Sequence, residues 1–490
     1  MVYFGYFLRI LTIVYLGVYY LQVYSYTSMK FINRKEELRV LEEKWESKTA
    51  QFFVMYGKRR VGKTELVKQF LKNKPGMYFL ADKRNHIDQL KELGRVTGNY
   101  FEDAILTRNG FFSWLEFFEY ISKKAKDPLV VVIDEYPYLV ETDAATSSLF
   151  QKGWDEYGKK SKIFLILLGS SISMMESEVL AYKAPLFGRR TGQMLVDPMT
   201  FEESRKFFPG KAFEACMSIY AITGGMPMYL SQIDSKISIK ENIKKKIFPH
   251  TEFLHNEVEF MLKEELREPK NYLSILKAIS WGKRKFGEIA NETGLKKSVA
   301  IKYLSVLERL RLVEKEVPVT EKHPHKSRKG LYILTDNFFR FWFQYIFPFK
   351  SDLEIGRTEY ALGRWEETFS TLEGLVYERV CRELLMRMDS ELFPMERIGK
   401  WWEREKEIDA VGLSEREKKI VFAECKWSNK KVGTNILEDL REKSQHVDWH
   451  QDDREEYFVL FSKSGFTANM KRLARENADI VLVEGSRVVR

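Results

Sequence analysis

The chain has 490 residues, which is too long for one hydrophobic core, so we expect two to four domains. Its composition, 44% hydrophobic and 31% charged with a formal net charge of +10, is ordinary for a soluble globular protein and permits a polyanionic partner without requiring one. The three cysteines lie far apart with no CxxC spacing, which argues against a disulfide framework or a zinc site and favours a reducing, cytoplasmic compartment.

The first 28 residues form an almost entirely apolar extension in which Arg9 is the only charge. The stretch is long enough to span a bilayer, but its tyrosines occur along the whole length, whereas membrane helices concentrate tyrosine at the interfaces. Two interpretations stay open, a membrane anchor or a translation start at Met29, where an ordinary soluble pattern begins. A membrane is a partner only if residues 1–28 are translated.

Residues 51–56 form a β-rich run that leads into GKRRVGKT, and a helical pattern follows. This is the GxxxxGK[ST] motif in the strand–loop–helix context that it requires. Its glycines let backbone N–H groups curl around phosphates, Lys63 reaches the β- and γ-phosphates, and the Thr64 hydroxyl binds Mg²⁺. The motif predicts an ATP site whose nucleotide-binding residues are Gly57, Lys58, Arg59, Arg60, Val61, Gly62, Lys63 and Thr64.

A second strand is expected to bring two acids to the same site. Residues 129–133 are a continuous apolar run, as in a parallel strand covered on both faces, and Asp134 stands at its carboxyl end. Open α/β sheets bind ligands at that edge. We expect Asp134 to hold the Mg²⁺ and Glu135 to orient or deprotonate the attacking water, with Lys63 completing the catalytic set.

Two further positions are candidates for contacts with ATP. The strand at 162–171 ends in Ser170 and Ser171, one of which either senses the γ-phosphate or caps the next helix. The loop APLFGRRTGQ carries Arg189, which would act as an arginine finger if protomers assemble into a homo-oligomer around ATP. The simpler interpretation of Arg189 is a solvated surface side chain.

These motifs occur in a fixed order together with FINRKEEL, VVIDEYPYL, LLGSS, PLFGRRTG and TGGMPMYL. In that order they resemble the archaeal ATPase family of the AAA+/STAND type over residues 29–265. The resemblance implies an α/β fold with a P-loop NTPase parallel sheet and a helical lid, ATP-binding and ATPase activity with Mg²⁺ as cofactor. It also implies that residues 33–38 pack by the adenine side and that 224–227 lie in the lid.

Residues 271–319 show three helical patterns separated at Gly282 and Gly294, and a β-like stretch follows that pairs plausibly with GLYILTD. This order predicts a winged helix-turn-helix. The third helix should bury Val299, Leu304, Leu307 and Leu310 and expose Lys296, Lys297, Ser298 and Lys302. Those exposed residues and the basic loop at 320–330 suit contacts with DNA, although such a domain also binds protein.

The stretch TDNFFRFWFQYIFPFK is unusually rich in aromatic residues. A stacking platform for nucleic acid is one interpretation. Because the rings would cover every side of a helix, a buried helix between domains is the favoured interpretation.

The last third of the chain contains a candidate nuclease site. Glu378 lies on an amphipathic helix pattern, Asp409 ends one β-like run, and Glu424-Cys425-Lys426 ends the next. If these strands are antiparallel, Asp409 and Glu424 meet and bind Mg²⁺ or Mn²⁺, which polarises a phosphodiester and activates water. Lys426 shares the strand face of Glu424, while Cys425 points into the core.

This D…ExK arrangement resembles the PD-(D/E)XK restriction-endonuclease-like fold over residues 370–490. The resemblance implies an α/β domain with Glu378, Asp409, Glu424 and Lys426 as catalytic residues, in a family whose members can lose cleavage. We therefore predict an ATPase that acts on DNA; the alternative is a signalling or scaffolding ATPase whose C-terminal domains bind protein. The expected units are an extension (1–28), a P-loop core (29–200), a helical lid (201–265), a winged helix (266–345) and a linker helix with nuclease-like domain (346–490).

Overall fold

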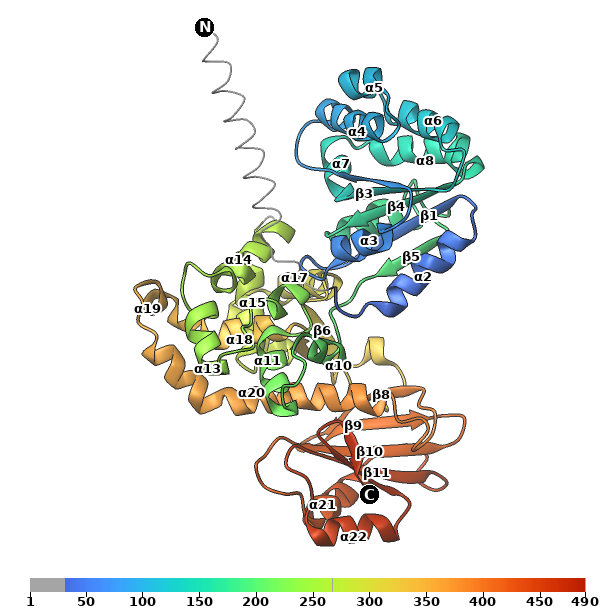
Figure 1. Ribbon diagram of the computed structural model, residues 1–490. Coiled ribbons are helices and arrows are strands. Elements are labelled where there is room, and N and C mark those ends of the chain that lie inside the picture. Colours follow the sequence, from blue (N-terminus) through green and yellow to red (C-terminus); the bar gives the residue numbers. More distant parts are fainter. Residues whose placement is uncertain (1–30, 267, 490) are drawn as a thin grey trace.

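The computed structural model describes residues 31–266 and 268–489, so the predicted extension at 1–28 lies outside the described residues. Figure 1 shows one sheet with its helices at one end of the molecule, a second sheet at the other end, and a helical region between them. Within the described ranges, no helix combines the length and apolarity that are needed to cross a bilayer.

The first sheet is the predicted parallel P-loop sheet, with strand order β2-β3-β4-β1-β5 and every pair parallel. All residues of β3 and β4 are buried, which explains why their sequences are continuous apolar runs. The strands are β1 (Gln51–Tyr56), β2 (Gly76–Leu80), β3 (Leu129–Asp134), β4 (Ile163–Gly169) and β5 (Gly192–Leu195).

Helices cover both faces of this sheet. Alternate side chains of β1 point to opposite faces and therefore belong to two separate hydrophobic cores. Phe52 and Val54 belong to one core, Phe53 and Met55 to the other. The elements are α2 (Lys35–Glu46), α3 (Lys63–Leu71), α4 (His86–Tyr100), α5 (Ala104–Asn109), α6 (Trp114–Lys124), α7 (Tyr136–Thr142), α8 (Thr146–Glu156), a 3₁₀ turn (Gly158–Lys160), α9 (Ile172–Met175) and a π turn (Glu176–Leu180).

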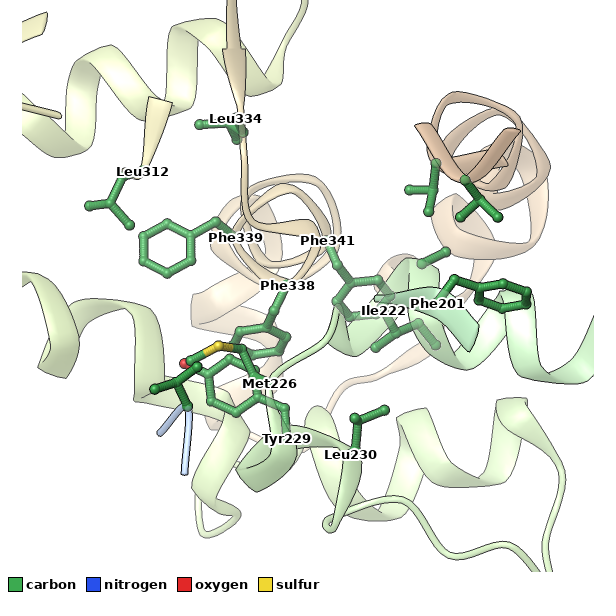
Figure 2. Close-up of a cluster of buried hydrophobic side chains, with 14 of the residues drawn as sticks. Phe201, Ile222, Met226, Tyr229, Leu230, Leu312, Leu334, Phe338, Phe339 and Phe341 are labelled. Carbon is green, nitrogen blue, oxygen red and sulfur yellow. The ribbon is translucent and has the colours of Figure 1, made fainter. Parts of the chain in front are cut away.

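The lid that follows is helical, as the resemblance implied. It packs against the aromatic helix α18 (Asn337–Tyr345) through a shared apolar cluster, in which Met226, Tyr229 and Phe338 meet (Figure 2). Its elements are α10 (Phe201–Ser204), a 3₁₀ turn (Arg205–Phe207), α11 (Phe213–Thr223), α12 (Pro227–Leu230), α13 (Ile239–Asn242), a π turn (Ile243–Ile247) and α14 (Phe253–Glu265).

Three helices and a two-stranded hairpin form the helix-turn-helix region. Leu304, Leu307 and Leu310 are buried as predicted, but Val299 is only half-buried because its neighbour Ala300 takes the core position. The exposed face was predicted correctly and carries Lys296, Lys297, Ser298 and Lys302. The elements are α15 (Lys270–Ser280), α16 (Phe286–Thr293), α17 (Lys297–Arg309), β6 (Val313–Glu316), a 3₁₀ turn (Pro324–Lys326) and antiparallel β7 (Leu331–Leu334).

The aromatic stretch forms α18 (Asn337–Tyr345), in which every aromatic ring is buried. Its rings therefore pack in the core, which supports the buried helix over the stacking platform, while Phe347 and Phe349 immediately after it are half-buried. A 3₁₀ turn (Phe347–Phe349) and α19 (Lys350–Glu354) lead to the 27-residue helix α20 (Glu359–Leu385), which runs from the helical region to the second sheet (Figure 1).

The second sheet has the order β13-β12-β11-β10-β9-β8. The predicted antiparallel pairing of β9 with β10 is confirmed, while β10, β11 and β12 run parallel. The elements are β8 (Arg397–Glu403), β9 (Lys406–Ser414), β10 (Lys419–Lys426), α21 (Thr434–Ser444), β11 (Glu455–Ser462), α22 (Ala468–Glu476), β12 (Ile480–Glu484) and β13 (Arg487–Val489).

Candidate functional site

The P-loop connects the carboxyl end of β1 to the first turn of α3. Gly57 has φ 152°, and a Cβ there would lie 2.4 Å from the Val196 carbonyl oxygen, so the tight turn requires glycine. Lys63 is buried at the start of α3 and donates hydrogen bonds to the carbonyl oxygens of Gly57 (2.8 Å) and Lys58 (3.0 Å). Burial lowers the pKa of Lys63 to about 8, although Glu135 and Asp134 act against this shift.

Asp134 ends β3 beside this loop, at the edge where Leu80 of β2 is its partner in register. Its Oδ2 accepts hydrogen bonds from the Thr64 hydroxyl (2.8 Å) and from the Tyr78 hydroxyl. Hydroxyl and carboxylate oxygens are the donors that Mg²⁺ prefers, so this pair fits the ion that the family implies. The structure therefore brings the two predicted Mg²⁺ ligands of the ATP site together.

Glu135 and Ser170 form the next contact along the same sheet edge. The Ser170 hydroxyl donates to Glu135 Oε1 at 2.6 Å, and the Ser170 backbone N–H donates to Oε2 at 3.3 Å. Glu135 has φ 53°, in the left-handed region that is costly for a residue with a side chain. Such strain is typical of functional positions. Ser170 thus orients the predicted catalytic carboxylate, a contact that the sequence did not reveal.

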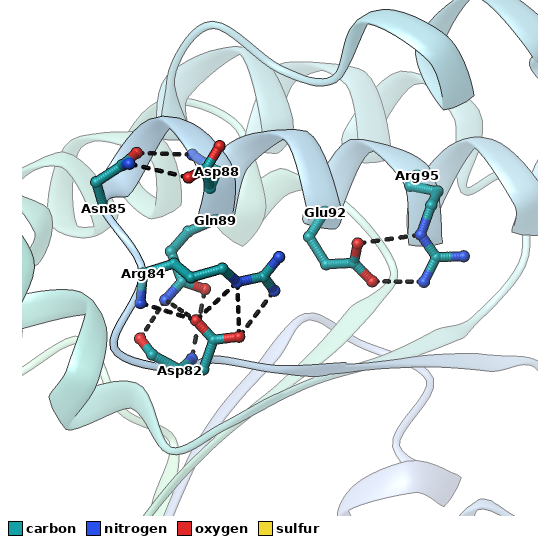
Figure 3. Close-up of polar contacts among 7 residues, drawn as sticks. All are labelled: Asp82, Arg84, Asn85, Asp88, Gln89, Glu92 and Arg95. Carbon is teal, nitrogen blue, oxygen red and sulfur yellow. Dashed lines mark hydrogen bonds and ion pairs between the residues drawn. The ribbon is translucent and has the colours of Figure 1, made fainter. Parts of the chain in front are cut away.

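The loop after β2 borders the same sheet edge and is held by local polar contacts (Figure 3). Arg84 forms an ion pair with Asp82, and Asn85 caps α4 by accepting from the Asp88 N–H at 3.0 Å. The Lys83 ammonium lies 5.5 Å from the ring centre of Tyr138, whose hydroxyl accepts a hydrogen bond from the guanidinium of Arg59 in the P-loop. The loop is therefore fixed against the P-loop from one side.

The two P-loop arginines point toward α14 of the lid. Arg60 makes two hydrogen bonds with the buried Glu257 (3.0 and 3.3 Å), and Arg59 pairs with Glu264 at 3.1 Å. Glu265 lines a narrow cavity that Arg59 also lines. Sequence reasoning missed these partners. The acidic stretch EVEFMLKEELREPK was visible, and its charge is complementary to KRR in the P-loop.

Lys58, the second residue of the P-loop, faces away from Lys63 toward the helix-turn-helix region. Its ammonium lies 3.9 Å from Asp336 Oδ2, and burial lowers its pKa although Asp336 opposes the shift. Asp336 caps α18 by accepting from the Phe338 N–H at 2.9 Å. Both side chains line a cavity of about 480 Å³ between the lid, the hairpin and α20.

Arg189 does not reach the P-loop of its own chain. It stands three residues before β5, whose first residue Gly192 pairs with Phe53 of β1, so it lies at the amino-terminal edge of the sheet. The P-loop follows the opposite edge. Arg189 forms an ion pair with Asp155 (3.1 Å), and its role as a finger toward a second protomer stays a prediction.

The predicted carboxylates of the C-terminal domain converge. The β9–β10 register, extended by one residue beyond Ala410–Ala423, sets Asp409 opposite Glu424, and both are buried. Asp409 Oδ2 accepts from the Cys425 N–H at 2.9 Å. Burial, followed by the charges of Glu378 and Glu424, raises the pKa of Asp409 to about 7.

Each glutamate of this site is paired with lysine. Lys426 Nζ lies 2.7 Å from Glu424 Oε1, and Lys443 of α21 lies 3.4 Å from both Glu424 oxygens. Lys400 of β8 is 3.2 Å from Glu378. Lys400 and Lys443 were not predicted to take part in this site. Across residues 31–266 and 268–489 no three acidic, histidine or cysteine side chains are grouped to hold a metal.

Cys425 is buried on the other side of the strand, as predicted, close to Cys381. Burial raises the pKa of the Cys381 thiol and raises that of the Cys425 thiol well above its ordinary value, so neither forms a reactive thiolate at neutral pH. Cys425 therefore belongs to the core.

Helix α20 connects all of these parts. Its Glu378 belongs to the C-terminal site, and the next residue, Arg379, donates to the Thr335 carbonyl oxygen of the helix-turn-helix region at 2.9 Å. Arg382 pairs with Glu316 of the hairpin at 2.8 Å. Glu373 of α20 accepts a hydrogen bond at 3.0 Å from the indole of Trp427, the residue that follows Lys426 in the sequence.

Comparisons with known proteins agree with this architecture. Residues 31–233 match the ATPase domain predominantly from Archaea, 270–315 match bacterial regulatory proteins of the arsR family, and 342–437 match archaeal and bacterial proteins of unknown function. An uncharacterized protein of Methanocaldococcus jannaschii is 35% identical over 459 residues, which is 93% of this chain and 99% of that relative.

An uncharacterized ATP-binding protein of the same organism is 55% identical over 49 residues, 10% of this chain and 83% of its own length. Among solved structures, the Walker-type ATPase of Pyrococcus abyssi has a TM-score of 0.50 at 20% identity, with 64% of this chain and 96% of that chain covered. The predicted P-loop fold and the helix-turn-helix are confirmed.

Proposed function

We propose that this chain, which belongs to the family of ATPases found predominantly in Archaea, is an ATP-driven switch that acts on DNA through its winged helix and its C-terminal domain. Hydrolysis of ATP is the activity of the family and of this P-loop. The rest of the proposal rests on α20, which joins two domains. Its residue Glu378 contacts Lys400 of the C-terminal domain, and the next residue, Arg379, contacts the helix-turn-helix region.

At the ATP site, each side chain has a separate task. The backbone N–H groups at the start of α3 and the Lys63 ammonium bind the phosphates. Thr64 and Asp134 would hold Mg²⁺, which neutralises phosphate charge when it is bound. Glu135 orients the attacking water, and Ser170 holds the Glu135 carboxylate in place through its hydroxyl and backbone N–H.

DNA would be bound through the exposed face of α17 and the wing. Lys297 and Lys302 are exposed on this helix, and the loop between β6 and β7 adds exposed Lys322, Lys326 and Lys329. Ammonium groups on a helix and an adjacent loop fit phosphates on either side of a groove.

The C-terminal domain would carry the metal-dependent nuclease-like site. Asp409 and Glu424 are the carboxylates that would hold Mg²⁺ or Mn²⁺, which supplies an activated water and polarises the phosphodiester when it is bound. Lys426 would stabilise the developing negative charge, and Glu378 would position Lys400, whose ammonium lies 3.2 Å away. The raised pKa of Asp409 supports crowding of carboxylates, which is the condition that a cation relieves.

The test combines binding and cleavage on one labelled duplex. If about four ammonium–phosphate contacts form, affinity should fall about 10²-fold between 50 and 200 mM salt. Lys297→Ala should weaken binding and reduce the salt slope by about one, whereas Lys244→Ala, an exposed lysine of the lid, should change neither. Cleavage is followed in the same samples with Mg²⁺ or Mn²⁺. Binding without any salt dependence contradicts DNA as the partner.

One observation favours a second candidate, a scaffolding or signalling ATPase that does not cut. The wing is docked on the edge strand β8, where the Val319 N–H donates to the Lys400 carbonyl oxygen at 2.9 Å and Arg397 donates to the Val319 carbonyl oxygen at 3.2 Å. Together with the lysine-paired acids, this contact suits a domain that binds protein. Intact duplex at every metal concentration, with ATP hydrolysis preserved, would select this candidate.

A further inference from the structure

The carboxyl-terminal part of α14 places acidic side chains beside the P-loop, although ATP hydrolysis does not require them there. Glu257, Glu264 and Glu265 are spaced along this helix, and the first two bind Arg60 and Arg59. Tyr229 adds a hydrogen bond to Glu257 at 3.2 Å, which fixes its carboxylate in a buried position. The helix is thus attached to the P-loop by two ion pairs, of which Arg60–Glu257 is also a charge-assisted hydrogen bond, the stronger class.

Glu265 is the acid without such a partner. Its Oε2 is buried and makes no hydrogen bond. It lines a cavity of only about 20 Å³ together with Arg59 and with Ser170, the residue that holds Glu135. A space of this size accommodates about one water molecule, not a phosphate group. Glu265 therefore lies beside Arg59 of the P-loop and beside Ser170, with a buried oxygen that no hydrogen bond occupies.

The charges at this point agree with the geometry. Burial raises the pKa of Glu265 to about 7, while the cations Arg59 and Lys63 act to lower it and the carboxylate of Glu135 raises it. The electrostatic neighbours of Glu265 are thus groups of the ATP site. In addition, the carboxyl end of a helix carries partial negative charge, so the end of α14 as a whole is complementary to these cations.

We propose that the carboxyl end of α14, with Glu265 at its tip, is a tethered anion that competes with the phosphates of ATP for the P-loop cations, and that nucleotide binding displaces it. The inference goes beyond the proposed function, since it assigns a regulatory role to a lid helix at a site whose hydrolysis is already established.

The displacement has a mechanical consequence. Only four residues separate the end of α14 at Glu265 from the start of α15 at Lys270. Four residues span at most about 14 Å, so α15 cannot stay in place if α14 moves far. Lys58 of the same P-loop lies 3.9 Å from Asp336 at the end of the hairpin. Movement at the phosphate site would therefore reach the winged helix by two short connections.

Nucleotide affinity provides the first measurement. In Glu265→Gln the competing charge is absent. At pH 8, where the Glu265 carboxylate is ionised, we expect ADP and ATP to bind about 5- to 10-fold more tightly to the full-length variant than to the unaltered protein in equilibrium titrations with a fluorescent nucleotide. Glu259→Gln is the matched control, because Glu259 lies on the same helix but pairs with Lys350 at 2.6 Å. Unchanged or weaker binding in Glu265→Gln overturns the proposal.

Hydrogen exchange of the unaltered protein supplies an independent readout that does not depend on a variant folding correctly. Amides of residues 253–265 should exchange faster when ADP or ATP is added, while those of β3 and β4 should not. Slower or unchanged exchange in α14 on saturation with nucleotide overturns the proposal. Neither measurement involves DNA or cleavage, so their failure is distinct from failure of the proposed function.

Discussion

The ATP site and the C-terminal site use the same kinds of side chain but satisfy them differently. In the ATP site Asp134 and Glu135 accept from the hydroxyls of Thr64 and Ser170, and Lys63 donates to backbone carbonyl oxygens. The acids and the lysine are thus held by neutral groups. A ligand that carries both phosphate and metal can take over these hydrogen bonds without separating Lys63, Asp134 or Glu135 from a charged partner.

In the C-terminal site, by contrast, lysines neutralise the glutamates directly. Glu424 lies near Lys426 and Lys443, and Glu378 lies near Lys400. A metal ion must compete with ammonium groups that are already in place, and breaking a buried pair is costly. The comparison teaches that aspartate, glutamate and lysine can form a site whose side chains are ready for the ligand, or a site whose ion pairs must first separate.

The largest effect is expected at the prepared site. Lys63→Ala removes the ammonium that binds the β- and γ-phosphates, and ATP turnover should fall by about 10³-fold. Steady-state phosphate release measures this loss. Lys68→Ala, in the same helix but exposed and paired with Glu65, should leave turnover within twofold of the unaltered protein. A smaller loss for Lys63 than for Lys68 would be incompatible with the assignment.

The corresponding change at the C-terminal site is Asp409→Asn, which keeps the shape of the side chain and its hydrogen bond from Cys425. Removing one carboxylate ligand should reduce Mg²⁺- or Mn²⁺-dependent cleavage of duplex DNA by about 10²-fold and leave ATP turnover unchanged. Asp453→Asn, at an exposed ion pair with Lys418 in the same domain, is the control. Equal cleavage by both variants would remove Asp409 from the mechanism.

The smallest expected effect concerns Glu265, the buried acid near the ATP site that lacks a hydrogen bond at Oε2. Its pKa is raised to about 7 in the folded chain, so between pH 4.5 and 7 the folded chain holds a proton that the unfolded chain releases. The contribution of Glu265 to stability is therefore lost as pH rises through this window. Glu265→Gln should gain about 2 kcal/mol in unfolding free energy over the unaltered protein between pH 5 and pH 8.

Urea titrations at the two pH values measure this difference. The matched variant Glu259→Gln controls for the loss of a carboxylate from the same helix, since Glu259 is paired with Lys350 rather than buried beside the P-loop. A constant difference for Glu265→Gln would mean that this carboxylate titrates normally in the folded chain.

Much of the fold was predictable because its signals are local. The P-loop, Asp134 and the antiparallel pair that joins Asp409 to Glu424 are each encoded within a few consecutive residues and a strand pattern. Burial at Val299 was misjudged, since a helical period that is shifted by one residue puts Ala300 in the core instead. Adjacent positions of a helix differ by 100°, so small apolar side chains leave the face ambiguous.

The contacts between distant segments could not be predicted. Arg60 and Glu257 are separated by 197 residues, and Lys400 meets Glu378 through a strand and a helix whose patterns say nothing of each other. Charge complementarity reduces the number of possible contact pairs, but a chain with 80 basic and 70 acidic residues still offers too many pairs for the correct one to be identified.

The position of Glu378 on α20 has a consequence for how this protein can be divided. A fragment that starts after Leu385 keeps both strand carboxylates but loses the glutamate, and Lys400 is left with Glu407. The same cut removes Arg379, which donates a hydrogen bond to the Thr335 carbonyl oxygen, and Arg382, which pairs with Glu316 of the hairpin. A cut at the apparent boundary before the second sheet would thus separate Glu378 from the C-terminal site and break the contacts of α20 with the helix-turn-helix region, so the C-terminal domain should be exchanged together with α20 and the winged helix.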